Sequence, residues 1–238
     1  MIKISRSALE LYLSCKKCFV LQYKHKIRPF SLPFTLNVCV DELFKKEADA
    51  YREKNQKHPA LLEKGLNASF FKHELMDEWR ENFKGLKYFN DTTGILFSGA
   101  VDDVLEKDNG QLIVCDIKAT SKINFDWAET CRKYTFPEAY ERQLECYQYL
   151  LAKNGFDVAK EGFLIYYNGQ KDRLFEQKIH FDLHLIEIDC DYSWIDDALI
   201  AARDCLQSEE MPSSSENCQN CNYLKKRWQL SQQNPEVM

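Results

Sequence analysis

The chain has 238 residues, of which 45% are hydrophobic and 13% aromatic, so it carries enough apolar side chain for a substantial core and lacks the composition of a disordered protein. Its formal net charge of −5 is unusual for a protein whose overall field attracts nucleic acid, and any such binding must therefore use a local basic surface. No apolar run approaches the roughly 20 residues of a membrane span, and the first residues lack the apolar stretch of a signal peptide. We therefore expect a cytoplasmic protein with no membrane partner.

The hydrophobic pattern predicts a series of helices and strands, with no internal repeat and no low-complexity linker. Ser7 and Glu10 form a capping box for a short first helix. A long amphipathic helix follows over 36–55, with Leu43 and Phe44 facing inward. The remaining predicted elements, in chain order, are a helix over 72–84, strands over 88–106 and 112–120, a helix over 137–154, strands over 161–167 and 175–189, and a helix over 192–208.

This order of elements, in which a short set of strands is followed by a helix and then by further strands, is typical of a mixed central sheet flanked by helices. We therefore predict an α/β fold. We also expect a single domain over residues 1–238 with its core at about 36–190, in which the N- and C-terminal segments form one region of their own.

The segment 98–120 carries the most chemical information. An Asn-Gly dipeptide between two short apolar runs favours a tight hairpin turn. In the second run, the period of two of a strand places Asp116 and Lys118 on one face, and Asp102 lies in the preceding strand, within reach across the hairpin. Two carboxylates that hold a hard cation, beside a lysine that stabilises phosphate charge or orients a water molecule, are suited to metal-dependent phosphodiester hydrolysis. Taken alone, an Asp-x-Lys pair is more often a solvated surface pair.

Further motifs accompany this hairpin. Gly99 lies three residues before Asp102, and Gln143 and Tyr147, four residues apart, share one face of a predicted helix. In this order the motifs resemble those of the PD-(D/E)XK nucleases, specifically the RecB-like branch that includes the AddB nuclease domain and the CRISPR-adaptation-associated exonucleases. The resemblance implies a restriction-endonuclease-like core and a nuclease that requires Mg²⁺ or Mn²⁺. It also implies that the helix of Gln143 and Tyr147 contacts the nucleic-acid strand, the alternative being that Tyr147 belongs to the aromatic core.

The resemblance further implies a third metal ligand, because RecB-like nucleases usually carry a Gly-x-x-x-His pattern in an early helix. Here Asn37 stands at the glycine position and Asp41 at the histidine position. A carboxylate can bind Mg²⁺ or Mn²⁺ as an imidazole does. The expected metal ligands are therefore Asp41, Asp102 and Asp116. The alternative is that Asp41 is an ordinary solvent-facing helix residue.

Four of the ten cysteines form two Cys-x-x-Cys pairs, Cys15 with Cys18 and Cys218 with Cys221. Because an intracellular chain keeps its thiols reduced, such pairs indicate a metal or cluster site before disulfides. The pairs are too distant in sequence for a zinc ribbon, so we expect one centre that joins the two ends of the chain. In the resembled nucleases, one N-terminal cysteine and a C-terminal cysteine cluster hold a 4Fe–4S cluster. This chain departs from that pattern in having no cysteine after Cys221, and four thiolates also suit tetrahedral zinc. The other cysteines are expected to be small core residues: Cys39, Cys115, Cys131, Cys146, Cys190 and Cys205.

Two short basic runs near the chain ends are the candidate DNA contacts. If the cysteines join the ends, these runs become neighbours and form a patch that can follow a phosphate backbone. The alternative is a set of scattered, solvated charges. The first run is Lys16, Lys17, Lys24, His25, Lys26 and Arg28, and the second is Lys225, Lys226 and Arg227 with Trp228. The expected DNA contacts among them are Lys24, Lys26, Arg28, Lys225, Lys226 and Arg227.

These observations predict a metal-dependent deoxyribonuclease of exonuclease character. Its expected substrate is DNA that is single-stranded or has a free end, and its expected partners are proteins of DNA repair, recombination or CRISPR adaptation. The alternative is a weakly active or inactive DNA-binding or assembly module of the same fold with a structural metal centre. Divergence at Asp41 favours the alternative, whereas the intact set of motif residues favours the enzyme.

Overall fold

The computed structural model describes residues 1–233, and none of the helices within that range is long and apolar enough to cross a membrane. The described residues form two compact units. The sheet unit comprises Pro33–Tyr88 and Phe97–Ile195, and the terminal unit comprises Met1–Leu32, Phe89–Leu96 and 196–233. The predicted single domain over the whole chain stays a prediction.

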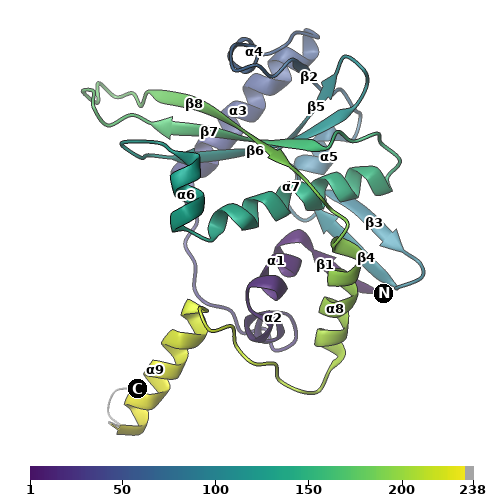
Figure 1. Cartoon of the computed structure of the whole chain (residues 1–238), viewed down its shortest axis with the longest axis vertical. Helices are drawn as coiled ribbons and strands as arrows, with labels where there is room; N and C mark the ends of the chain where they lie inside the picture. Colours follow the sequence, from purple (N-terminus) through teal and green to yellow (C-terminus); the bar gives the residue numbers. More distant parts are fainter. Residues whose placement is uncertain (234–238) are drawn as a thin grey trace. The chain divides into compact units, whose positions relative to one another are not determined.

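The sheet unit is built on a five-stranded sheet with the order β2-β5-β6-β7-β8 (Figure 1). β6 and β7 are parallel and the other neighbours are antiparallel, so the sheet is mixed, as predicted. Parallel neighbours require a crossover connection, and α6 and α7 lie in the connection between β6 and β7. The elements of this unit are α3 (Thr35–Glu53), α4 (Pro59–Glu63), β2 (Ala68–Phe70), α5 (Met76–Arg80), β5 (Asp103–Lys107), β6 (Leu112–Thr120), α6 (Trp127–Lys133), α7 (Phe136–Lys153), β7 (Glu161–Gly169) and β8 (Phe181–Asp189).

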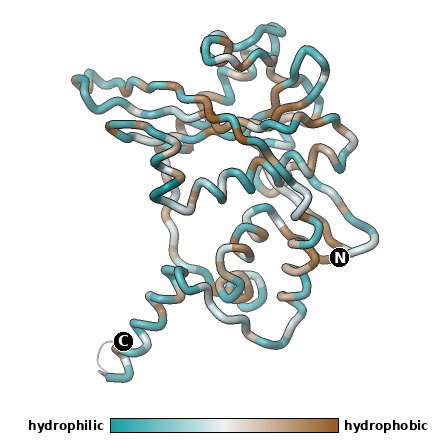
Figure 2. Tube along the Cα trace, viewed as in Figure 1, coloured by the Kyte–Doolittle hydropathy of each residue, from teal (hydrophilic) through white to brown (hydrophobic). Residues whose placement is uncertain are grey.

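The two faces of β6 meet different helices. Phe44 of α3 belongs to the same core cluster as Ile113 and Cys115, which lie on the predicted apolar face of β6. Lys118, on the other face, donates a hydrogen bond of 3.4 Å to Gln143 of α7. Helices α3 and α7 therefore cover opposite faces of the central strand, and Figure 2 shows hydrophobic residues gathered along the middle of the sheet.

The terminal unit brings both ends of the described chain together. Its helices are α1 (Arg6–Ser14), α2 (Lys16–Tyr23), most of α8 (Ile195–Gln207) and α9 (Gln219–Gln233). Tyr12 of α1 packs edge-on against Phe19 of α2, with the ring centroids 5.4 Å apart. The strand β1 (Ile2–Ser5) belongs to a three-stranded sheet with the order β1-β4-β3, in which β3 is Leu86–Asn90 and β4 is Ile95–Gly99.

Several helix predictions need correction. The first helix is capped by Ser5, whose Oγ accepts from the N–H of Ala8 at 3.2 Å, and not by the predicted Ser7. Leu43 was predicted to face inward but is 58% exposed, because the buried stripe of α3 follows Phe44 at intervals of four residues. The helix predicted over 72–84 is only the five-residue α5. It ends before Gly85, whose positive φ of 61° and close approach to the backbone at Gly99 leave no room for a side chain.

Two predicted core cysteines, Cys39 and Cys131, are exposed.

The long strand predicted over 88–106 is three strands, β3, β4 and β5. A turn around Gly94, which has a positive φ of 66°, separates β3 from β4. The strand predicted from residue 175 begins only at Phe181, because Glu176 and Gln177 adopt positive φ angles that a strand does not allow. By contrast, β6 has the predicted limits.

Candidate active site and cysteine centre

The hairpin of β5 and β6 brings together three of the residues that the sequence analysis selects. The pairing of Asp103 with Cys115 sets Asp102 beside the outgoing strand, and Asp102 Oδ2 accepts from the backbone N–H of Ile117 at 2.9 Å. Lys118 forms an ion pair with Asp116, which is fully buried. Asp102 was predicted to lie near the middle of a strand, but it lies just before β5, which begins at Asp103.

Asp41 joins this group from α3. Lys45, one turn further along the helix, places its Nζ 2.8 Å from Asp41 Oδ2 and 3.4 Å from Asp102 Oδ1. The ammonium group therefore bridges a helix carboxylate and a hairpin carboxylate. The side chain of Asp41 is 28% exposed and shares Lys45 with Asp102, and its role as a metal ligand stays a prediction.

The carboxylates differ in their electrostatics. Burial raises the pKa of Asp116 to about 7, with a contribution from the charge of Asp102 and against the opposing effect of Lys118. Burial and the charge of Asp102 also raise the pKa of Asp41. For Asp102, burial is outweighed by Lys45, Lys118 and the Ile117 N–H, and its pKa lies below the ordinary value. Asp102 is thus the group most firmly held as an anion.

The carboxylates have unused ligand capacity. Oδ1 of Asp41 and both oxygens of Asp116 are buried and lack a hydrogen-bond partner in the described part of the chain, although Asp116 keeps its ion pair with Lys118. Buried acceptors left in this state are costly, and a hard cation with oxygen ligands would satisfy them. Asp102, Asp116 and Asp41 therefore fit the ligand set of a divalent cation, next to the two lysines that now balance their charge.

Gln143 and Tyr147 lie behind Lys118 and not on an open surface. Gln143 Oε1 accepts from Lys118 Nζ at 3.4 Å, and its Nε2 donates to the Tyr147 hydroxyl at 3.1 Å. Both side chains are buried, at 9% and 3% exposure. The ring of Tyr140 lies on another side of the same ammonium, with Nζ 4.5 Å from the centroid. This arrangement orients Lys118.

Sequence reasoning missed a buried charge network beside the site. Asp103 is fully buried and forms ion pairs with Arg52 of α3, at 2.5 Å, and with Arg80 of α5. Asp49 contacts both arginines from the surface side. The signal was present in the sequence, since Arg52 continues the stripe of buried α3 positions at a spacing of four. A charged residue on an apolar stripe requires a buried partner.

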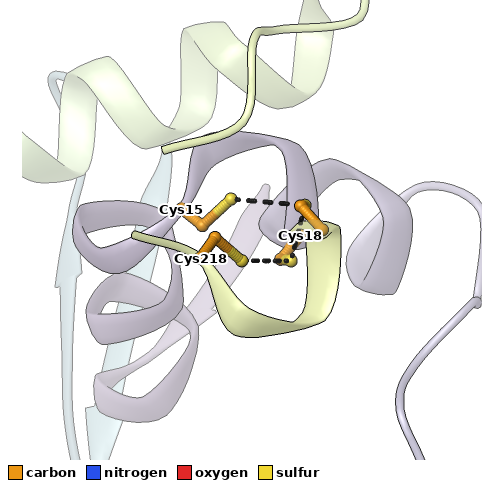
Figure 3. Close-up of side chains that lie close together, drawn as sticks. Cys15, Cys18 and Cys218 are labelled. Atoms are coloured by element: carbon orange, nitrogen blue, oxygen red, sulfur yellow. Dashed lines mark hydrogen bonds between the residues drawn. The ribbon is translucent and has the colours of Figure 1, made fainter. Parts of the chain in front are cut away.

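The four cysteines of the two Cys-x-x-Cys pairs converge, as predicted. Their sulfur atoms all lie within 4.8 Å of one another, and no other group of three or more potential metal ligands in residues 1–233 is as close. Cys18 Sγ lies 3.4 Å from Cys218 Sγ and 3.5 Å from Cys221 Sγ, and Cys15 Sγ lies 3.9 Å from Cys221 Sγ (Figure 3). The centre joins the start of α2 to the start of α9.

The thiols of this centre titrate unequally. Although burial acts to raise it, the pKa of Cys15 falls to about 6 because the backbone N–H groups of Cys18 and Ser215 stabilise the thiolate. Burial raises the pKa of Cys221 to about 11. Four sulfurs with no counter-charge among them match a site for a thiophilic cation.

The predicted basic runs are exposed in the terminal unit. Lys24 and Lys26 donate to the backbone carbonyls of Ser208 and Tyr23, at 2.5 and 3.0 Å. A groove of about 600 Å³ runs beside Cys221, and it is Lys17 of α2 that lines it together with Lys225 of α9. The groove therefore brings together one lysine from each of the two predicted basic runs.

Comparison with known proteins places the chain in a family. Residues 34–225 match the family model of the PD-(D/E)XK nuclease superfamily. The chain belongs to this superfamily. No curated protein sequence matches the chain. Two solved structures of LHK-Exo, an alkaline exonuclease from Laribacter hongkongensis, are similar to it, one of them in complex with dAMP. Their sequence identities are 15% and 14% and their TM-scores 0.40 and 0.39, and each match covers 95% of this chain and 93% of the other.

Proposed function

We propose that this chain is a Mg²⁺- or Mn²⁺-dependent deoxyribonuclease that acts on DNA with a single-stranded or free end. The observation that carries the proposal is the group formed by Asp102, Asp116 and Lys118, with Asp41 added from α3. Family membership supports a nuclease. The unsatisfied carboxylate oxygens of Asp41 on α3 and Asp116 on β6 support a cation bound between this helix and this strand.

Each residue has a distinct role in this proposal. Asp102, Asp116 and Asp41 hold the cation, which when bound supplies a Lewis acid for the phosphate and an activated water molecule. Lys118 places its ammonium where negative charge develops on the phosphate, and Gln143 keeps it in that position through the bond of 3.4 Å. Asp116, Gln143 and Tyr140 all contact the Lys118 ammonium. The side chain therefore needs little movement when charge develops on the phosphate.

The direct test is cleavage of end-labelled single-stranded DNA with Mg²⁺, with Mn²⁺ and with EDTA. We expect cleavage with either metal and none with EDTA. Asp116→Asn and Lys118→Met should each lower the rate by on the order of 100-fold or more, since each removes a charge at the reacting group. The matched control is Lys160→Ala, because Lys160 is a lysine at an exposed ion pair, with 74% of its side chain accessible.

Melting temperatures of all three variants establish that they fold. Wild-type rates for both Asp116→Asn and Lys118→Met, or undiminished cleavage in EDTA, would contradict the proposal. DNA binding without cleavage under any metal condition would instead support the inactive module, which the bridging position of Lys45 between two carboxylates favours.

For the cysteine centre we propose a single tetrahedral ion, with zinc as the candidate. With Zn–S bonds of about 2.3 Å, a tetrahedral site sets its sulfurs roughly 3.8 Å apart. The three sulfur separations of 3.4, 3.5 and 3.9 Å support this spacing. A 4Fe–4S cluster binds each thiolate to a different iron and holds the four sulfurs further apart.

Metal analysis and an absorbance spectrum of anaerobically purified protein decide between zinc and the predicted 4Fe–4S cluster. One zinc per chain and no band near roughly 400 nm would support the single ion. Iron with acid-labile sulfide and such a band would overturn it in favour of the cluster.

A further inference from the structure

A small pocket of the sheet unit is lined in part by Lys118, and the proposed cleavage reaction does not by itself require this pocket. Its volume is about 230 Å³. The wall combines four aromatic rings with two lysines, which is an unusual pairing for a simple core defect. These residues are Lys118, Lys122, Phe125, Phe136, Tyr140 and Tyr166.

The four rings form two packed pairs. Tyr140 packs against Phe136 with centroids 5.4 Å apart, and Phe136 is 36% exposed. Phe125 packs against Tyr166 with centroids 5.0 Å apart. Partly exposed rings that face a concave space offer flat apolar surfaces on which a planar group can stack.

The second lysine is fixed and lacks a counter-charge. The buried side chain of Asn168 accepts from the backbone N–H of Lys122 at 2.7 Å and donates to its carbonyl at 3.0 Å. The Lys122 ammonium donates to the neutral hydroxyl of Thr130 at 2.7 Å. No carboxylate in residues 1–233 forms an ion pair with Lys122, so its positive charge remains available to an anion.

We propose that this pocket binds one unpaired nucleotide of the substrate strand, with the base stacked on Tyr140 and Phe136 and a phosphate on Lys122. This inference rests on the proposed nuclease function and deepens it. Lys118 belongs to both the pocket and the catalytic group, so the nucleotide in the pocket adjoins the phosphate that is cut. The pocket lies below the roughly 300 Å³ at which drug-sized sites begin, so it holds one base and not a base pair.

The substrate that follows from this geometry is a strand with an unpaired nucleotide at the site of cleavage. A blunt duplex cannot enter the pocket without breaking its end pair, which costs unstacking energy. Single-stranded DNA enters without that cost. The enzyme should therefore bind single strands more tightly than blunt duplexes of the same sequence, and the difference should depend on Tyr140.

The experiment measures equilibrium binding of a fluorescently labelled thymidine octamer and of a blunt duplex, in EDTA so that nothing is cut. Tyr140→Ala should weaken binding of the octamer by roughly 5- to 160-fold, the range for loss of one stacked base. Tyr140→Phe should bind like the wild type, because it keeps the ring. Lys122→Gln should weaken binding and reduce its salt dependence without touching Lys118. Phe89→Ala, an aromatic removed from a 41% exposed position on β3, is the matched control.

Melting temperatures exclude unfolding, and Phe136→Ala provides a second ring deletion at a more exposed position. Octamer binding at wild-type strength by both Tyr140→Ala and Lys122→Gln would overturn the inference, as would an equal loss for octamer and duplex. The pocket and the nuclease proposal fail separately. Octamer binding that depends on Tyr140, without metal-dependent cleavage, keeps the pocket and removes the nuclease. Metal-dependent cleavage, together with unchanged octamer binding in Tyr140→Ala and Lys122→Gln, keeps the nuclease and removes the pocket.

Discussion

Replacement of Asp103 by asparagine should destabilise the protein far more than replacement of any surface carboxylate. Asp103 is fully buried and faces two arginines, Arg52 and Arg80, and its Oδ1 also accepts from the backbone N–H of Val104 at 2.8 Å. Removal of one partner from a buried ion pair costs about 3–5 kcal/mol, because the remaining charge stays buried and unpaired. Asp49 keeps contact with both arginines, so the lower end of that range, about 3 kcal/mol, is expected.

Urea unfolding of Asp103→Asn beside Asp108→Ala measures this difference. The second variant breaks a pair between Lys57 and a carboxylate that is 71% exposed and therefore screened by water, so its midpoint should stay close to that of the wild type. With a typical slope of about 1–3 kcal/mol per molar urea, a loss of about 3 kcal/mol should lower the midpoint of the Asp103 variant by about 1–3 M at an unchanged slope. Equal midpoints for the two variants would refute the argument that a buried ion pair stabilises this hairpin more than an exposed one does.

Three further outcomes are expected. Lys45→Met removes the ammonium that separates two carboxylates, so the variant should melt lower in EDTA and recover more on addition of Mn²⁺ than the wild type does, as thermal denaturation with and without metal will measure. Gln143→Ala frees Lys118 from its hydrogen bond and should lower kcat about tenfold with KM little changed, whereas a fall in melting temperature at an unchanged rate would point to a role in the core alone. Cys218→Ser should release the metal of the cysteine centre and expose the ends of the chain to limited proteolysis, and Cys39→Ser, at an exposed cysteine, should do neither.

The parts of the structure that the sequence predicted well are those where one local rule suffices. Strand β6 has the predicted limits because alternation and an Asn-Gly turn specify both its faces and its start. The convergence of the four cysteines was predicted from the spacing of the two Cys-x-x-Cys pairs, which is typical of thiolate ligands. The single long strand predicted over 88–106 is wrong, because the polar run from Asn90 to Gly94 forms a turn between β3 and β4. That run was visible in the sequence and was not used.

The parts that were missed depend on tertiary contacts. Lys45 was missed because its i, i+4 pair with the predicted ligand Asp41 is one that any exposed helix could carry, and only the approach of Asp102 brings this lysine into the site. The pocket next to Lys118 draws its rings from α7, β7 and the connection after β6, so no continuous segment carries its signature. Arg52 is different, because its place on an apolar helix stripe was visible in the sequence and was not used.

The consecutive aspartates Asp102 and Asp103 link the stability of the hairpin to the chemistry of the site. Neighbouring side chains at the start of a strand point in different directions, so one carboxylate enters the buried arginine pair while the other meets Ile117 and Lys45. The arginines fix the position of Asp103, and the peptide bond transmits that position to Asp102. The proposed metal ligand Asp102 is thereby held in place by a neighbour that is buried between two arginines. Under the proposed function, a variant of Asp103 that still folds should cleave DNA more slowly through displacement of Asp102.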